Sequence, residues 1–334
     1  MTLKDFNDAL MQKGQWLPLD PPDDGRATIG GVVATGLGGA QQFGYGPPRR
    51  HVIGMKVVLA DGSLIKVGGR VVKNVAGYDL CKLFTGSYGT LGVIVEVNFK
   101  LRPVPFETRT VTAWGQWSDL ISGARRILDS RLFPVAVEVL SPALANEAEL
   151  SYEKDHFLLV RFAGSQGEVV VQTMQAIELL QNTNYREPEC LKGDDSTLWQ
   201  SLAALPLRFQ KDLLWRGGFR PAQAEHFVAI YKGTCAAQAH EPRWQVGLGH
   251  GRVRVVDRIT NGPDEMAEKR VRQSIDRVEG LSETAQSMGA SLIIEHAPPE
   301  IRNRVKILKT LNGADVIMQR IKQQLDPDGV FPSL

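Results

Sequence analysis

Three glycines at every third position, in the run Gly86-Ser-Tyr-Gly89-Thr-Leu-Gly92, constrain the fold of this chain more than any other feature. The apolar segment before the run predicts a short helix over 80–84, and the alternating segment after it predicts a strand over 93–101. Glycine allows backbone conformations closed to other residues and lets another group come close. The run therefore predicts a tight turn that contacts either a cofactor or a neighbouring segment. Asp79 is predicted to cap the helix.

The order of these elements excludes several nucleotide sites. A Rossmann fingerprint, G-x-G-x-x-G, follows a strand and opens a helix, whereas this run follows a helix and opens a strand. The sequence contains neither a P-loop motif nor a G-x-S-x-G nucleophile elbow. A nicotinamide Rossmann site, a P-loop site and a serine hydrolase site are therefore not expected.

The composition argues against several other classes of protein. The six histidines include no pair at metal-ligand spacing, and the three cysteines lie far apart, so we expect no metal site, no disulfide framework and a reducing compartment. A net charge of +2 gives no reason to expect nucleic acid as a partner. The sequence has no apolar run of the ~20 residues that a membrane span needs.

The first third of the chain predicts small, glycine-rich elements. We expect a helix over 3–13, and a second helix from Thr28 whose exposed first amides could hold an anion. Strands over 52–59 and 63–67 are joined by the turn Ala60-Asp-Gly62, which is typical of a hairpin. The proline-containing segment 102–105 interrupts this pattern and marks a domain boundary.

The remainder predicts a mixed α+β layer, with antiparallel strands covered by helices. Glu295 and His296 end a predicted strand and are the best acid–base candidates by position, although adjacent strand residues point to opposite faces and need not share a site. The expected strands cover 135–140, 157–163, 210–215, 244–248, 252–257 and 290–295, and the expected helices cover 118–129, 167–182, 197–204, 221–231, 263–288 and 313–325.

Four motifs in a fixed order carry a family resemblance. They are Ala27-Thr-Ile-Gly-Gly-x-x-Ala-Thr35, Val52-x-Gly-x-x-Val-Val-x-Ala-Asp-Gly62, Lys73-Asn-Val-Ala-Gly-Tyr-Asp-Leu80 and Leu83-Phe-x-Gly-Ser-x-Gly-Thr-Leu-Gly-Val93. Together they resemble the FAD-binding domain of the vanillyl-alcohol-oxidase/p-cresol-methylhydroxylase (PCMH) type. The third motif is more narrowly similar to the FAD-binding subunit of bacterial glycolate oxidase.

This resemblance implies the fold, the cofactor and the residues that bind it. It implies a PCMH-type FAD-binding domain over 1–105 with a mixed or antiparallel sheet, an α+β cap domain over 106–312, and a C-terminal helix and return segment over 313–334. The first five cofactor-binding residues that it implies lie along the pyrophosphate and isoalloxazine, and the last six line the adenosine end. These residues are Pro22, Asp23, Gly30, Gly31, Thr35, Gly77, Gly86, Ser87, Gly89, Thr90, Gly92 and Val93.

Two departures from the family pattern lead to a further expectation. In the family the first half of the FAD domain carries a glycine-rich pyrophosphate loop and would occupy ~50–70 residues before the position of Trp16, on the usual size of such a domain half. Fifteen residues precede Trp16 here, so we expect the first half of the FAD domain to be absent and the domain to be shortened. At the other end, the family's G-V-F-N-P-G-R is replaced by Gly329-Val-Phe-Pro-Ser-Leu334.

The resemblance implies an FAD-binding subunit of a heteromeric, glycolate oxidase-like 2-hydroxy-acid dehydrogenase that oxidises glycolate to glyoxylate. Its implied partners are a larger flavin subunit and an iron–sulfur subunit, in the cytoplasm or peripheral to the inner membrane through the complex. Two alternatives stay open: a non-catalytic, flavin-free assembly subunit, and a stand-alone FAD oxidoreductase acting on another 2-hydroxy acid such as D-lactate. No catalytic base is assigned.

Overall fold

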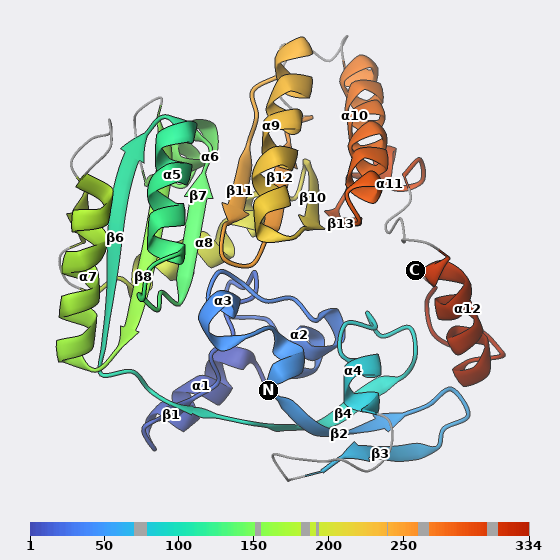
Figure 1. Ribbon diagram of the computed structural model, residues 1–334. Helices are drawn as coiled ribbons and strands as arrows, with labels where there is room; N and C mark the ends of the chain where they lie inside the picture. Colours follow the sequence, from blue (N-terminus) through green and yellow to red (C-terminus); the bar gives the residue numbers. More distant parts are fainter. Residues whose placement is uncertain are drawn as a thin grey trace. The chain divides into compact units, whose positions relative to one another are not determined.

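A computed structural model of the chain describes residues 1–69, 79–150, 155–181, 188–191, 194–238, 240–259, 267–305 and 313–333. The chain divides into two compact units (Figure 1). Unit 1 comprises Met1–Val104 with Asn312–Leu334, and unit 2 comprises Pro105–Leu311. One predicted cofactor residue, Gly77, lies outside the described residues together with most of the third motif.

Unit 1 begins with α1 (Leu3–Met11), which Thr2 caps by accepting a hydrogen bond from the Asp5 amide. The chain then forms β1 (Gln15–Trp16), which pairs with β5 (Arg102–Pro103). Three short helical elements follow β1, namely α2 (Ile29–Thr35), α3 (Gln42–Tyr45) and the 3-10 helix η1 (Pro48–Arg50). The predicted helices near 3–13 and after Thr28 are therefore confirmed.

The sheet of unit 1 has three antiparallel strands in the order β3 (Leu64–Gly68), β2 (Val52–Val58) and β4 (Val93–Phe99). Gly62, with φ of +80°, makes the predicted hairpin turn between β2 and β3. Between β3 and β4 lies α4 (Leu80–Phe84), at the predicted position. The core of this unit centres on Met55 and Phe84, and α12 (Ala314–Leu325) packs against it through Ile321 and Leu325.

Unit 2 is built on an eight-stranded sheet in which every neighbouring pair of strands is antiparallel. Four longer helices pack with it, namely α5 (Trp117–Leu128), α7 (Gln166–Gln181), α9 (Pro221–Ala237) and α10 (Ala267–Ser287) (Figure 1). In spatial order the strands are β13 (Leu292–His296), β10 (Leu213–Gly218), β12 (Arg252–Asp257), β11 (Trp244–Gly247), β7 (Ala136–Leu140), β8 (His156–Gly164), β6 (Glu107–Gly115) and β9 (Glu189–Cys190).

Short helical elements complete unit 2: α6 (Pro142–Glu147), α8 (Ser196–Ala204), the 3-10 helix η2 (Leu205–Phe209) and α11 (Pro299–Arg302). Alternation along β10 separates two environments. The Trp215 ring meets the rings of Phe227 and Tyr231 on α9, and the next residue, Arg216, points to the opposite face and pairs with Glu295.

The structure of unit 2 differs from the sequence analysis in two places. Strand β6 was not predicted, because its partners in β8 and β9 lie far along the chain. Thr110 and Thr112 are fully buried, and the Thr110 hydroxyl donates to Asp195 at 2.6 Å. The strand expected over 210–215 begins three residues later, because the chain first forms η2 and a turn at Asp212.

Candidate functional site

Helix α2 supplies one side of the predicted cofactor site. Thr28 caps it by accepting a hydrogen bond from the Gly31 amide at 3.2 Å, and Gly36 ends it in the left-handed region. The Ile29 amide donates to the Met1 carbonyl at 3.3 Å. The prediction that the first amides of this helix hold an anion is therefore wrong for Ile29 and Gly31. Thr35 also uses its hydroxyl locally, donating to the Gly31 carbonyl at 2.8 Å.

The glycine run is docked against the end of α2 by its backbone. The Gly86 amide donates to the Val33 carbonyl at 3.0 Å, and the Tyr88 amide donates to the Ala34 carbonyl at 2.7 Å. A Cβ on Gly36 would lie 3.0 Å from the Cα of Gly86, so the two backbones are in direct contact. The structure thus brings together two motifs that are 50 residues apart in the sequence, and we call residues 85–92 the glycine loop.

The three glycines of the loop have different surroundings. Gly86 and Gly89 have positive φ, +84° and +74°, and a Cβ at either would meet no atom of the described residues within 4 Å. At Gly92, by contrast, a Cβ would lie 2.6 Å from Val57 Cγ1 on β2. Gly92 therefore serves packing against the neighbouring strand, whereas the space beside Gly86 and Gly89 is open to a ligand.

The hydrogen bonds of the polar side chains in the glycine loop indicate whether a cofactor would fit beside it. The Ser87 hydroxyl oxygen is buried and has no hydrogen-bond partner among the described residues, although burying such a group unpaired is costly. The Thr90 hydroxyl instead donates to the Ser87 carbonyl at 2.7 Å. Open glycine backbone beside an unpaired hydroxyl fits a ligand that carries phosphate or sugar hydroxyl groups, such as FAD.

The remaining predicted residues surround these elements in unit 1. Asp23 Oδ1 accepts hydrogen bonds from the amides of Gly25 and Ala27, both at 2.8 Å, and so holds the turn after Pro22. A Cβ on Gly30 would approach the Ile94 carbonyl oxygen at 3.7 Å, which places the start of α2 beside β4.

Val93 and Asp79, two residues for which the sequence predicted roles, lie next to the glycine loop in the chain. Val93 begins β4 and is half exposed. Asp79 stands at the predicted cap position of α4, but its carboxylate makes no capping hydrogen bond and instead pairs with Lys82 at 2.9 Å. The capping prediction for Asp79 is therefore wrong in its chemistry, although it was right in position.

Sequence reasoning missed a connection between α12 and the glycine loop. Lys322 donates to the carbonyl oxygens of Thr90 and Phe331, both at 2.9 Å, and also to the Asp326 carboxylate. Burial alone would raise the pKa of Asp326, but hydrogen bonds from Lys322 and from the Phe331 and Val330 amides outweigh it and lower this pKa. The only sequence signal was the spacing of a lysine and an aspartate four residues apart at the end of a helix.

Unit 2 has a second polar cluster, centred on Glu295 in β13. Its carboxylate accepts from Arg254 Nε at 2.8 Å and pairs with Arg216 Nε at 2.9 Å. Burial would raise the pKa of Glu295, but the charge and hydrogen bonds of Arg254, with Arg216 and Arg252, lower it. Burial, together with Arg254 and Arg216, lowers the pKa of Arg252 to about 10. Glu295 and Arg252 are therefore both charged near neutral pH.

His296 does not share this cluster. Its Nδ1 lies 3.1 Å from the Asp212 carbonyl oxygen, while Glu295 points toward the arginines. The two residues point apart, as the strand geometry predicted, and they do not form an acid–base pair.

A histidine–carboxylate pair joins the turn between β11 and β12, which carries His250, to Glu138 of β7. His250 Nε2 is 3.1 Å from Glu138 Oε1, and His250 Nδ1 accepts from the Arg252 amide at 3.2 Å, which assigns the proton to Nε2. The second Glu138 oxygen accepts from Gln245 at 2.9 Å. A Cβ on Gly247 would lie 2.1 Å from the His250 ring, so only glycine allows this arrangement.

The described residues contain no cluster of three or more histidine, cysteine, aspartate or glutamate side chains arranged to hold a metal ion. None of the helices in the described part of the chain is long and apolar enough to cross a membrane.

Comparisons with known proteins give matches to parts of this chain. A family model described as FAD binding domain matches residues 1–68. Glycolate oxidase subunit GlcE of Escherichia coli is 47% identical over 98 residues, covering 29% of this chain and 28% of that protein. Glycolate oxidase subunit GlcD of Bacillus subtilis is 39% identical over 135 residues, covering 40% of this chain and 28% of that protein.

The other matches extend further along the chain. D-lactate dehydrogenase of Archaeoglobus fulgidus is 30% identical over 222 residues, covering 60% of this chain and 48% of that protein. The chain thus spans about half or less of the length of these three curated relatives. A solved alkyldihydroxyacetonephosphate synthase structure shares the fold, with a TM-score of 0.66, 16% identity and coverage of 99% of this chain and 63% of that chain. Residues 1–68 thus match an FAD binding domain, and the chain is similar to FAD-binding proteins of the PCMH type.

Proposed function

We propose that the chain is the FAD-binding subunit of a heteromeric, glycolate oxidase-like dehydrogenase that oxidises glycolate to glyoxylate. The similarity to two glycolate oxidase subunits supports this choice. Its partners would be a larger flavin subunit and an iron–sulfur subunit, in the cytoplasm or at the face of the inner membrane. FAD, when bound, would accept the hydride from the hydroxyl-bearing carbon of the substrate.

This proposal depends on the glycine loop, which is hydrogen-bonded to the end of α2. Among the described residues, none fills the space at Gly86 and Gly89 and none pairs with the Ser87 hydroxyl. We propose that these three residues contact FAD, with Thr90 and Val93 beside them. Of the other residues that the resemblance implies, Pro22, Asp23, Gly30, Gly31 and Thr35 would shape the turns around FAD, and Gly77 and Gly92 complete the motifs.

We further propose that the arginine cluster of unit 2 binds the substrate carboxylate. Three arginines, Arg216, Arg252 and Arg254, lie around the Glu295 carboxylate, and the charge of Glu138 also acts on Arg252, so that arginines outnumber these two carboxylates. A planar guanidinium binds a carboxylate through two parallel hydrogen bonds, and its charge stays fixed near neutral pH. A small 2-hydroxy acid suits such a cluster, because its carboxylate is the anionic handle.

A second candidate is a stand-alone oxidoreductase acting on another 2-hydroxy acid. The D-lactate dehydrogenase relative supports it, because that match covers more of this chain than the two glycolate oxidase matches do. The two candidates differ in whether the chain turns over alone, and with which acid.

Flavin content provides the first test. The purified chain, alone and after incubation with FAD, should absorb between about 350 and 500 nm, where a bound isoalloxazine absorbs. Gly86→Ala should reduce the bound flavin. Gly62→Ala is the matched control, because Gly62 has φ of +80° and equally open surroundings, yet lies in the β2–β3 turn. Both substitutions carry a similar backbone cost of about 1–2 kcal/mol.

Ser87→Ala separates a role in binding from a role in folding. Removing an unpaired buried hydroxyl should leave the stability of the flavin-free chain unchanged or higher, while flavin affinity falls. The proposal fails if no flavin binds to the chain or to its mixture with partner subunits. It also fails if Gly86→Ala and Gly62→Ala bind flavin equally well.

Turnover provides the second test. Oxidation of glycolate and D-lactate is measured for the chain alone and with the two partner subunits. Activity with glycolate only in the mixture supports the complex, and activity of the chain alone with D-lactate supports the second candidate. Arg252→Lys should raise the KM for the 2-hydroxy acid by about tenfold, because lysine cannot bind the substrate carboxylate through two parallel hydrogen bonds. The flavin content should be unchanged. An unchanged KM contradicts the carboxylate role of this cluster.

A further inference from the structure

Lys232 on α9 is a half-buried amine that lies beside a histidine and an aromatic ring. Its Nζ is 3.5 Å from Nε2 of His156, the first residue of β8, and 5.6 Å from the centre of the ring of Trp117, the first residue of α5. The three side chains belong to unit 2 and come from elements that are far apart in the sequence. The tertiary structure therefore places two groups around one nucleophilic nitrogen, and we call these three residues the Lys232 cluster.

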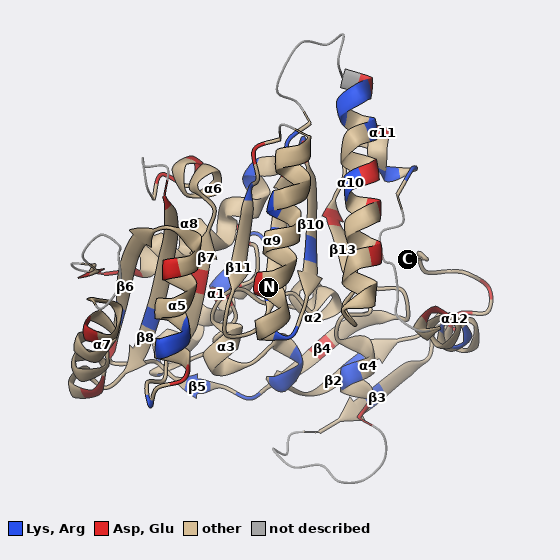
Figure 2. Cartoon of the chain, turned by 45° about the horizontal axis from the view of Figure 1, so that its top comes forward, with Lys and Arg blue, Asp and Glu red and all other residues tan. Residues whose placement is uncertain are grey.

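None of the carboxylates in the described part of the chain pairs with Lys232. Figure 2 shows that α9 carries few charged residues, and Glu225 is its only acid. The Glu225 carboxylate accepts a hydrogen bond from Arg125 Nε at 3.1 Å instead. Asp155, which comes just before β8, accepts from the Gln116 side chain at 3.2 Å. The ammonium form of Lys232 therefore lacks the opposite charge that usually stabilises it.

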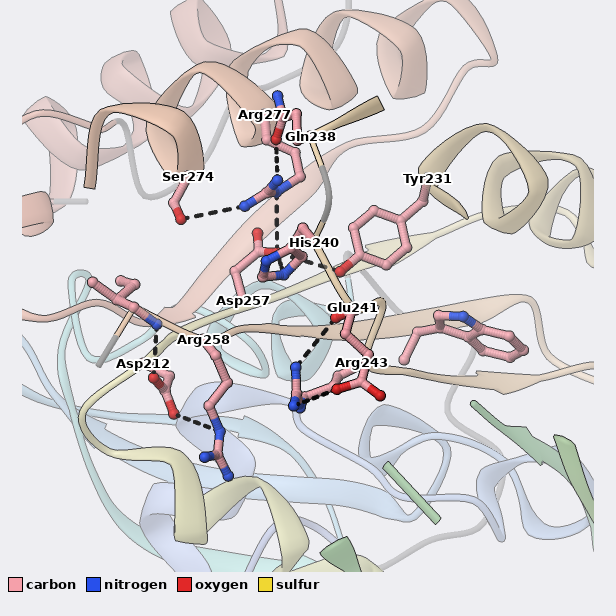
Figure 3. A network of polar contacts seen from close by, with 12 residues as sticks. Asp212, Tyr231, Gln238, His240, Glu241, Arg243, Asp257, Arg258, Ser274 and Arg277 are labelled. Atoms are coloured by element: carbon pink, nitrogen blue, oxygen red, sulfur yellow. Dashed lines mark hydrogen bonds and ion pairs between the residues drawn. The ribbon is translucent and has the colours of Figure 1, made fainter. Parts of the chain in front are cut away.

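The preceding residue on α9 has a different environment. The Tyr231 hydroxyl donates to Asp257 at 3.3 Å within a buried polar network (Figure 3). Asp257 also pairs with Arg277 at 3.2 Å, so a carboxylate balances the buried cation there. Lys232 follows Tyr231 by one residue, which turns its side chain about 100° around the helix axis. Neighbouring positions of one helix thus hold a balanced ionic network and an amine without a carboxylate partner.

Two effects act on the protonation of Lys232 in opposite directions. Burial lowers the pKa of Lys232, whereas the face of the Trp117 ring attracts the ammonium form, by about 0.5–1 kcal/mol at exposed sites. Burial, followed by the charge of Lys232, lowers the pKa of His156 to about 4, so the histidine ring is neutral at pH 7. An ammonium has no acceptor, so Nε2 is the unprotonated nitrogen of that ring and accepts from Nζ. The lone pair of the neutral amine is then free to attack a ligand.

From this geometry we propose that Lys232 binds small carbonyl compounds covalently, as a reversible imine. The neutral Nζ attacks the carbonyl carbon, so that a C–N bond forms and an electron pair of the C=O bond moves onto oxygen. Nζ then loses its two protons and the former carbonyl oxygen leaves as water. One amine and one carbonyl compound thus give one imine and one water. His156 Nε2, at 3.5 Å, lies where it takes a proton from Nζ in this step.

The ligand class is a small aldehyde or 2-oxo acid. Gly233, the next residue on α9, is exposed and has no side chain, so it does not cover Nζ. A small compound can therefore reach Nζ from solvent, while the packing of Lys232 beside Trp117 limits its size. Glyoxylate and propanal are the two compounds to use, because they share an aldehyde and differ in the carboxylate. The site is independent of FAD and of the arginines around Glu295.

The test is reductive labelling of the full chain, in which cyanoborohydride converts an imine into a stable secondary amine. Peptide mapping by mass spectrometry then gives the labelling rate at each lysine. Lys232 should react at least about tenfold faster than Lys211, an exposed lysine of the same unit, since a positioned general base typically contributes ~10²–10⁴-fold. Fast labelling by either compound supports the site, and the faster compound identifies the class. Lys232→Arg keeps the positive charge and should remove the fast phase of labelling.

His156→Phe tests the role of the histidine, because it keeps an aromatic ring and removes the proton acceptor. It should slow labelling of Lys232 about tenfold, whereas His226→Gln, at an exposed position on α9, should leave the rate unchanged. Thermal unfolding of each variant confirms that it is folded, and the comparison of Lys232 with Lys211 needs no variant. The proposal is overturned if Lys232 reacts no faster than Lys211, or if folded His156→Phe labels Lys232 at the wild-type rate.

Discussion

His156, the first residue of β8, should make the stability of unit 2 depend on pH above the range in which carboxylates titrate. Its ring lies 5.5 Å from the Trp244 ring and 5.9 Å from the Trp117 ring, and Lys232 Nζ is 3.5 Å from its Nε2. Burial, followed by the charge of Lys232, lowers the pKa of His156 to about 4. The folded protein therefore holds this histidine neutral.

The magnitude follows from the difference between folded and unfolded pKa values. An unfolded histidine titrates near about 6.5, so the unfolded chain binds the proton first as pH falls. The contribution of His156 is fully present above that value and is lost progressively as pH falls toward about 4. Between about pH 8 and about pH 5, this linkage removes about 2 kcal/mol from the free energy of unfolding.

Urea unfolding followed by tryptophan fluorescence measures this loss, because Trp117 and Trp244 pack directly on the His156 ring. His156→Phe keeps a ring and removes the titration, so the wild type should lose about 2 kcal/mol more than the variant over the same pH interval. His226→Gln, at an exposed position on α9, should keep the wild-type pH dependence. Equal pH dependence for the wild type and His156→Phe would refute the reasoning.

The remaining predictions concern glycines and the connection from α12. Gly247→Ala would place a Cβ 2.1 Å from the His250 ring and should destabilise unit 2 by about 1–3 kcal/mol in urea unfolding. Gly280→Ala lies in α10 with no atom of the described residues within 4 Å of a new Cβ, and should stabilise the same unit by about 0.5–1 kcal/mol. If both changes have the same sign, the packing argument is wrong. Lys322→Met should speed amide hydrogen exchange in residues 85–92 while leaving β2 unaffected, and unchanged exchange in that loop would contradict the connection.

Local patterns were the part of the fold that could be predicted from the sequence. The hairpin of β2 and β3, the short helix α4 and the long helix α10 depend on turn residues and on periodicity within a few positions. Strand β6 was missed because its partner residues are distant in the chain. It pairs with β8 from Glu107 opposite Gly164 to Gly115 opposite His156, and Asp195 satisfies its buried Thr110 hydroxyl across 85 positions.

In the candidate site too, some features could be predicted from local sequence and others depend on the tertiary structure. The sequence by itself determined a tight glycine turn between a helix and a strand, since glycine spacing and apolar periodicity act over neighbouring residues. Only the tertiary structure decided that Gly92 packs on Val57 while Gly86 and Gly89 border open space. It also decided that Lys322 reaches Thr90 across 232 positions. Identical residues at equal spacing acquire different roles because the segments that surround them come from elsewhere in the chain.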